Sequence, residues 1–131
     1  MNEIMSIYEI ADLVISVTGQ MDSLFNYWMS ASFAVLVGSY IGKEHFNYST
    51  TLSISALYFL ASMMFFARYY AMSTLIVSYT ELAGTSLPPE FVTTSPIIGI
   101  TRVLTFLVGF ITTEVYLWNS YVETKKNEEN S

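Results

Sequence analysis

The chain has 131 residues, of which 53% are hydrophobic and 12% are charged, whereas a typical soluble domain has about 25% charged residues. A small soluble fold exposes too much of its surface to lose half of that charge, so the composition favours immersion in lipid. A net charge of −6 with five basic residues argues against a nucleic-acid surface. The absence of cysteine excludes disulfides and thiolate sites, and the length fits one membrane domain over 1–131.

The first segment, residues 1–20, is predicted to form a short amphipathic helix. One side of that helix is apolar, with Ile4, Ile7, Tyr8, Ala11, Val14 and Ile15. The helix lies at the membrane interface or against the rest of the protein. Its polar side lacks the Lys and Arg typical of interfacial anchors, so packing on the protein is at least as well supported. Gly19 is expected to end this helix, and Glu3, Glu9 and Asp12 argue against a cleavable signal peptide.

Three apolar stretches follow, each long enough to cross about 30 Å of hydrocarbon as a helix. We expect them at 23–42, 50–81 and 97–122. Aromatic residues mark the ends of the first stretch, with Tyr27 and Trp28 at one interface and Tyr40 at the other. The predicted fold is therefore an all-α membrane protein with three transmembrane helices and the short amino-terminal amphipathic helix.

The second stretch is longer than a bilayer requires, because nothing breaks it before Gly84. It must tilt or project from the membrane, and Arg68, which tyrosines follow, favours projection. The last residues, 123–131, form a polar tail that is expected to fray.

The orientation follows from the lysines outside the three stretches. Lys43 lies in the first connection, and Lys125 and Lys126 lie in the tail. Three crossings place that connection and the tail on the same side, which the positive-inside rule assigns to the cytoplasm. We therefore expect the amino terminus outside and the carboxyl terminus in the cytoplasm.

The third stretch has a polar side headed by Arg102. Thr105, Gly109 and Thr113 follow Arg102 on that side at helical spacing. Since hydrocarbon cannot satisfy polar groups, this side is expected to face the other helices or a second subunit. Arg102 either heads a polar ligand or ion path, or extends its long side chain to the outer headgroups.

Glu114 is the one carboxylate in the interior of a predicted span, since Glu81 stands at the end of the second stretch. Intramembrane carboxylates are candidates for proton coupling or cation binding. The alternative is a structural role near the inner interface, close to Trp118 and within reach of Lys43. Arg102, Thr105, Thr113 and Glu114 are thus the candidate residues of a ligand or ion path. No metal site is expected, because His45 and Glu44 alone supply too few ligands, and no cofactor motif is present.

Small residues recur every four positions on the first stretch, at Ser30, Ala34, Gly38 and Gly42. Small residues at this spacing let helix backbones approach closely. Together with Gly109 they predict close helix packing, equally within one chain or between copies.

These features predict a non-enzymatic membrane protein that acts by association, as a homo-oligomer or as an accessory subunit bound to another membrane protein. The alternative is an oligomeric channel or carrier with its path along the third helix. An enzyme is not expected, since the interiors of the spans hold one carboxylate and no histidine with which to position a nucleophile. Membrane lipid is the expected environment, and nucleic acid is not an expected partner.

Overall fold

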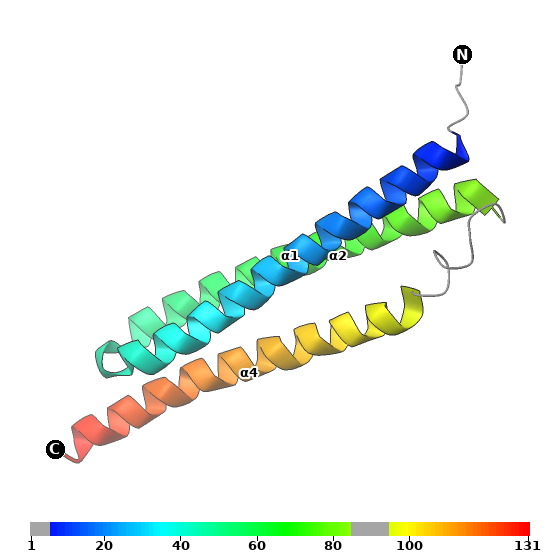
Figure 1. Cartoon of the computed structure of the whole chain (residues 1–131). Coiled ribbons are helices and arrows are strands. Elements are labelled where there is room, and N and C mark those ends of the chain that lie inside the picture. The colour runs from blue at the N-terminus through cyan, green and yellow to red at the C-terminus, as the bar shows by residue number, and fades with distance from the viewer. Residues whose placement is uncertain (1–5, 85–94) are drawn as a thin grey trace.

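The computed structural model describes residues 6–84 and 95–131, which form helices and short connections without any strand in those two ranges. The elements are α1 (Ile7–Gly42), the short 3₁₀ helix η1 (Lys43–His45), α2 (Tyr48–Ala83) and α4 (Ser95–Glu129). The three long helices lie side by side, with α2 antiparallel to α1 and α4 parallel to it (Figure 1). All three are long and apolar enough to cross a membrane.

Short-range polar contacts set the observed helix starts. Ser6 and Glu9 form a capping box at the start of α1, in which each side chain accepts a hydrogen bond from the other residue's backbone N–H. Asn47 caps α2 by accepting a hydrogen bond from the Thr50 N–H at 2.8 Å. These contacts satisfy backbone donors that a helix start leaves unpaired. Gly84, with φ +60°, follows the end of α2 as the sequence predicts.

The prediction that Gly19 ends an amino-terminal helix is wrong. A single helix, α1, runs from Ile7 through Gly19 to Gly42, so a separate amphipathic helix over 1–20 is not observed (residues 1–5 lie outside the described residues). Glycine inside a helix costs only about 1 kcal/mol relative to alanine. Val14 and Met21 on either side of Gly19 are both buried, and this packing outweighs the cost.

The carboxyl-terminal residues also differ from expectation, because the predicted frayed tail is helical as far as Glu129. Two contacts near the start of that segment hold it against the first connection. The Thr124 hydroxyl donates a hydrogen bond to the Lys43 carbonyl at 2.6 Å, and Tyr121 packs on Tyr48 with ring centroids 6.3 Å apart.

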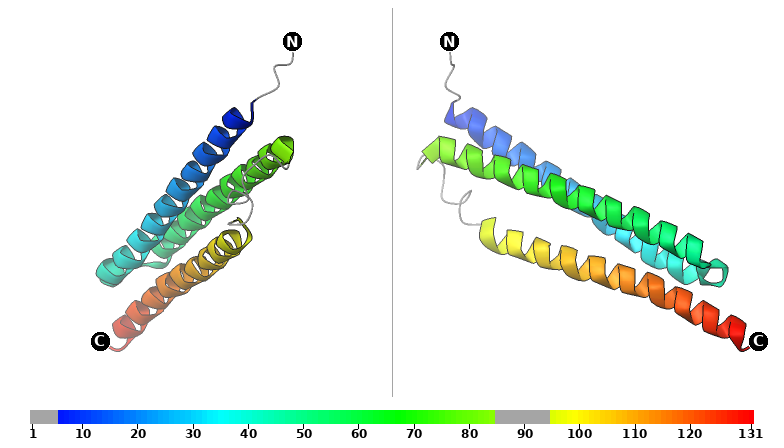
Figure 2. Two further views of the ribbon diagram at one scale, coloured as in Figure 1. Left: turned by 45° about the vertical axis from the view of Figure 1, so that its right-hand side comes forward. Right: turned by 180° about the vertical axis from the view of Figure 1, so that it is seen from behind.

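The core is a narrow seam in which the buried positions follow a heptad-like spacing. On α1 they are Ile10, Val14, Met21, Trp28, Ser32 and Ser39, on α2 Thr51, Tyr58, Ser62 and Phe65, and on α4 Phe106, Thr113, Leu117 and Ser120. Nearly half of these residues are serine or threonine, which is typical of helices that approach closely in an apolar medium. The opposite faces carry many exposed large apolar side chains. The three helices stay alongside one another when seen from behind (Figure 2).

The continuity of α1 predicts the effect of a substitution at Gly19. A Cβ at Gly19 would meet no heavy atom within 4 Å, and the backbone is helical there. Gly19→Ala is therefore expected to raise the free energy of unfolding by about 0.5–1 kcal/mol, measured by thermal unfolding followed by circular dichroism. A decrease would show that Gly19 has the left-handed conformation of a helix end.

Candidate functional site

The three helices meet at Trp28, which is 4% exposed. Its ring packs on Phe106 of α4 and Phe65 of α2, with centroid separations of 4.9 and 5.7 Å. Its indole N–H donates a hydrogen bond to the Ser62 hydroxyl at 3.1 Å. The sequence interpretation placed Trp28 in an interfacial aromatic belt, which is wrong, because the residue is buried between helices.

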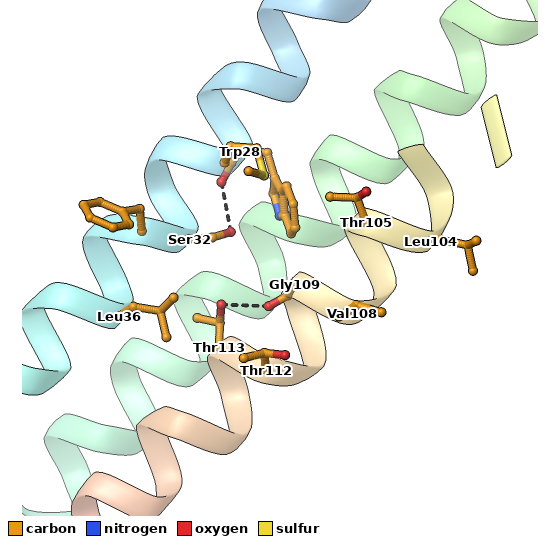
Figure 3. Close-up of a pocket in the computed structure, with 11 residues that line it drawn as sticks. Trp28, Ser32, Leu36, Leu104, Thr105, Val108, Gly109, Thr112 and Thr113 are labelled. Carbon is orange, nitrogen blue, oxygen red and sulfur yellow. Dashed lines mark hydrogen bonds between the residues drawn. The ribbon is translucent and has the colours of Figure 1, made fainter. Parts of the chain in front are cut away.

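A groove of about 490 Å³ opens beside Trp28 between α1 and α4. Figure 3 shows Trp28, Ser32 and Leu36 on one side of the groove and Thr105, Gly109 and Thr113 on the other, with α2 behind them. The full lining is Trp28, Met29, Ser32, Phe33, Leu36, Leu104, Thr105, Val108, Gly109, Thr112 and Thr113. The groove is open along its length and carries no charged side chain.

The hydroxyl groups that line the groove bond mainly to their own helices. Thr105 donates to the Thr101 carbonyl and Thr113 to the Gly109 carbonyl, each at 2.8 Å. Ser32 donates to the Trp28 carbonyl at 2.9 Å and also shares a 2.7 Å hydrogen bond with the Tyr58 hydroxyl. These three hydroxyls already have partners, which leaves Thr112 as the remaining hydroxyl in an otherwise apolar lining. The groove therefore suits an apolar occupant better than a polar solute.

Gly109 allows α4 to approach α1 at this level. A Cβ at Gly109 would lie 2.7 Å from Trp28 Cη2, which is well inside van der Waals contact. The predicted packing role of Gly109 therefore has a specific neighbour, the Trp28 ring, which in turn is held by Phe65, Phe106 and Ser62.

The other predicted packing residues lie elsewhere. Ser30, Ala34 and Gly38 are all exposed, and a Cβ at Gly38 would meet nothing within 4 Å. Gly42 is half-buried, with Phe46 Cε1 at 3.6 Å from the position of a Cβ. Ser30, Ala34 and Gly38 therefore form a small-residue strip on the exposed side of α1.

Arg102 forms an ion pair with Asp22 of α1, and its guanidinium carbon lies 5.9 Å from the centroid of the Phe25 ring. The two side chains are 23% and 50% exposed. A pair with this exposure contributes about 0–1 kcal/mol to stability. Its main effect is to fix the register of α4 against α1. The sequence interpretation did not pair these residues, because Asp22 was counted among the residues outside the spans.

Glu114 faces α2 instead of the groove. Its Oε2 accepts a hydrogen bond from the Ser55 hydroxyl at 2.7 Å. Its Oε1 is buried and has no hydrogen-bond partner in the described part of the chain, and the same holds for the Thr51 hydroxyl on α2. Lys43, which the sequence placed within reach of Glu114, instead lies over the Tyr40 ring at 5.7 Å.

The four predicted path residues therefore do not form one track. Thr105 and Thr113 line the groove, Arg102 is paired at one end of it with Asp22, and Glu114 bonds to α2. The geometry supports an apolar association groove and, separately, a small buried polar site around Glu114. In residues 6–84 and 95–131, no three His, Asp or Glu side chains gather as metal ligands would.

The contact between Gly109 and Trp28 predicts that Gly109→Ala destabilises the bundle. The added methyl must displace a ring confined by aromatic neighbours, and overpacking of this kind costs about 1–3 kcal/mol. The measurement is thermal unfolding together with the fluorescence of Trp28 in a Trp118→Phe background. Gly99→Ala, where a Cβ meets nothing within 4 Å, serves as the control. Unchanged stability and emission in Gly109→Ala would contradict the contact.

No family model, curated protein or solved structure matches this chain.

Proposed function

We propose that the chain is an integral membrane protein that acts by helix–helix association, as a homo-oligomer or as an accessory subunit of a membrane complex. The observation that carries this proposal is the uncovered middle of α1. There the small-residue strip of Ser30, Ala34 and Gly38 is exposed, and the apolar groove lies open between α1 and α4. In lipid, surfaces of this kind favour a helix neighbour, because close backbone approach adds van der Waals contact.

Charged residues at two levels support the membrane placement. Asp22 and Lys43 enclose the uncharged residues 23–42 of α1, which span about 30 Å at 1.5 Å per residue, close to the thickness of a bilayer core. Arg102 pairs with Asp22 at one level, and Thr124 contacts the Lys43 backbone at the other. The parts of α1 and α2 beyond the Asp22 level would then project from the membrane as an antiparallel pair.

The proposed orientation places the amino terminus outside and the carboxyl terminus in the cytoplasm. The hydrogen bond between Thr124 and Lys43 brings the first connection beside the end of α4. Lys43, Lys125 and Lys126 are therefore at the same end of the bundle, as the positive-inside rule requires of a cytoplasmic end. Tyr48, Trp118 and Tyr121 form an aromatic cluster near this end, which fits an interfacial belt.

The proposed role is non-enzymatic. The chemically capable side chains are dispersed, with His45 in η1, Asp22 held by Arg102 and Glu114 held by Ser55. A nucleophile with a base and an orienting group requires side chains within hydrogen-bond reach of one another. These pairs point instead to structural use of the charged groups.

The association proposal predicts a defined assembly. The membrane fraction, extracted with mild detergent, is expected to give an oligomer by light scattering and native mass spectrometry, or a stoichiometric complex with another membrane protein. Ala34→Phe places a large ring on the small-residue strip. If the strip packs against a neighbouring helix in the assembly, this variant is expected to reduce the assembled fraction. A chain that stays monodisperse in the supernatant without detergent, or a strict monomer with no co-purifying protein, would contradict the proposal.

The second candidate function is an oligomeric channel or carrier, and the observation that favours it is the buried Glu114 Oε1, which has no hydrogen-bond partner in the part of the chain described. A carboxylate oxygen available inside an apolar bundle can bind a passing cation or proton. In liposomes containing the purified protein, Glu114→Gln is then expected to reduce cation flux by about tenfold or more relative to wild type. Arg102→Ala tests an anion route, and Glu128→Gln in the exposed end of α4 is the control. Flux that is absent, or indifferent to both changes, rules out this candidate.

A further inference from the structure

We propose, on the basis of the proposed association function, that the α1–α4 face is a twofold interface between two copies of this chain. In this dimer α1 of each copy packs on α4 of the other, and the two grooves close against each other. Three independent features of the face support a second copy as the occupant: the sizes of its side chains, the register of its two helices and the charges at its end.

The first feature is the distribution of side-chain size across the face. The α1 side carries large side chains at heptad spacing, namely Met29, Phe33, Leu36 and Tyr40, and Phe33 is 68% exposed. The α4 side of the groove carries mostly smaller ones, namely Thr105, Val108, Gly109 and Thr112, with Leu104 as its one large side chain. A twofold axis between the helices places the large side of each copy on the small side of the other, as a self-complementary interface requires.

The second feature is the register of α1 and α4. The Asp22–Arg102 pair and the contact between Lys43 and Thr124 join residues 80 and 81 positions apart, at opposite ends of the groove. The two helices are therefore parallel with an almost constant offset. A twofold axis parallel to the helices keeps each residue at the same position along the bundle in both copies. Phe33 of one copy therefore lies at the level of Thr112 in the other.

The third feature is charge complementarity at one end of the face. Lys43, the first residue of η1, lies over the ring of Tyr40, the last of the large side chains on the α1 side. Glu123 follows Thr112 on α4 by about three helical turns. Both side chains are exposed. The sole salt bridge within residues 6–84 and 95–131 joins Arg102 and Asp22, so neither Lys43 nor Glu123 has an ion-pair partner there. Because their heights match, the twofold dimer brings Lys43 of each copy to Glu123 of the other.

The central test uses Thr112→Trp, which fills the groove that receives Phe33 of the second copy. This variant is expected to weaken dimerisation by about tenfold or more, since the centre of an interface carries most of its binding energy. Ser53→Trp makes the same kind of change at an exposed site on α2 and is expected to leave dimerisation unchanged. Dimerisation is measured in liposomes by energy transfer between differently labelled chains.

The charge test distinguishes pairing between copies from pairing within one chain. Lys43→Glu alone and Glu123→Lys alone each place like charges opposite one another twice per dimer. Each is expected to weaken its homodimer by several-fold, because like charges at an interface are repulsive. A mixture of the two variants restores both opposite-charge pairs, so we expect the mixed dimer to exceed each homodimer by about tenfold. A pair within one chain would not be restored by mixing.

The outcomes separate this inference from the association function. Wild-type oligomers that are insensitive to Thr112→Trp, with no preference in the charge-reversed mixture, would overturn the twofold interface and leave the association function standing. A bound lipid that native mass spectrometry finds on wild type and not on Thr112→Trp, with dimerisation unchanged, would overturn it in favour of an acyl chain in the groove. A strictly monomeric wild type without a partner would reject both proposals.

Discussion

The bundle depends on the insertion of the Trp28 ring between α2 and α4. The ring satisfies its one polar group at Ser62 and contacts Phe65 and Phe106, and its edge occupies the space that Gly109 leaves open. Aromatic pairs of this kind contribute about 0.5–1.5 kcal/mol each beyond their buried area. Without this junction the three helices would lose their shared aromatic contact, and the Trp28 ring would no longer line the groove.

The polar groups of the bundle are satisfied mainly within single helices. Most buried or half-buried serine and threonine hydroxyls donate to a carbonyl one turn earlier on their own helix, as Ser39, Thr113 and Ser120 do. Such a hydroxyl exposes little unsatisfied polarity and lets helices approach without a partner on the neighbouring helix. Among the described residues, the side-chain hydrogen bonds that join two long helices are few. They link Trp28 with Ser62, Ser32 with Tyr58, Ser55 with Glu114 and Arg102 with Asp22. These bonds select one register among the many that interchangeable apolar surfaces would permit.

The three long helices follow from composition and the length of the apolar stretches, and the end of α2 at Gly84 follows from glycine chemistry. The partners of individual side chains do not follow, because hydropathy reports the surrounding medium and says nothing about the neighbouring helix. Trp28 has the composition signal of an interfacial residue and is nevertheless buried. Gly19 is a residue type that often ends helices, but α1 continues through it because Val14 and Met21 on either side are packed in the core. The pairing of Asp22 with Arg102 depends on a helix register that no single helix specifies.

The unbroken course of α1 has a mechanical consequence. A continuous helix resists bending and twisting along its whole length, so its amino-terminal turns and the groove-lining turns move as one rod. Ile10 and Val14 pack near Ile76 and Tyr79 of α2, at the end of the bundle remote from η1. A displacement imposed at that end would therefore be carried by one rigid helix to the turns that line the groove.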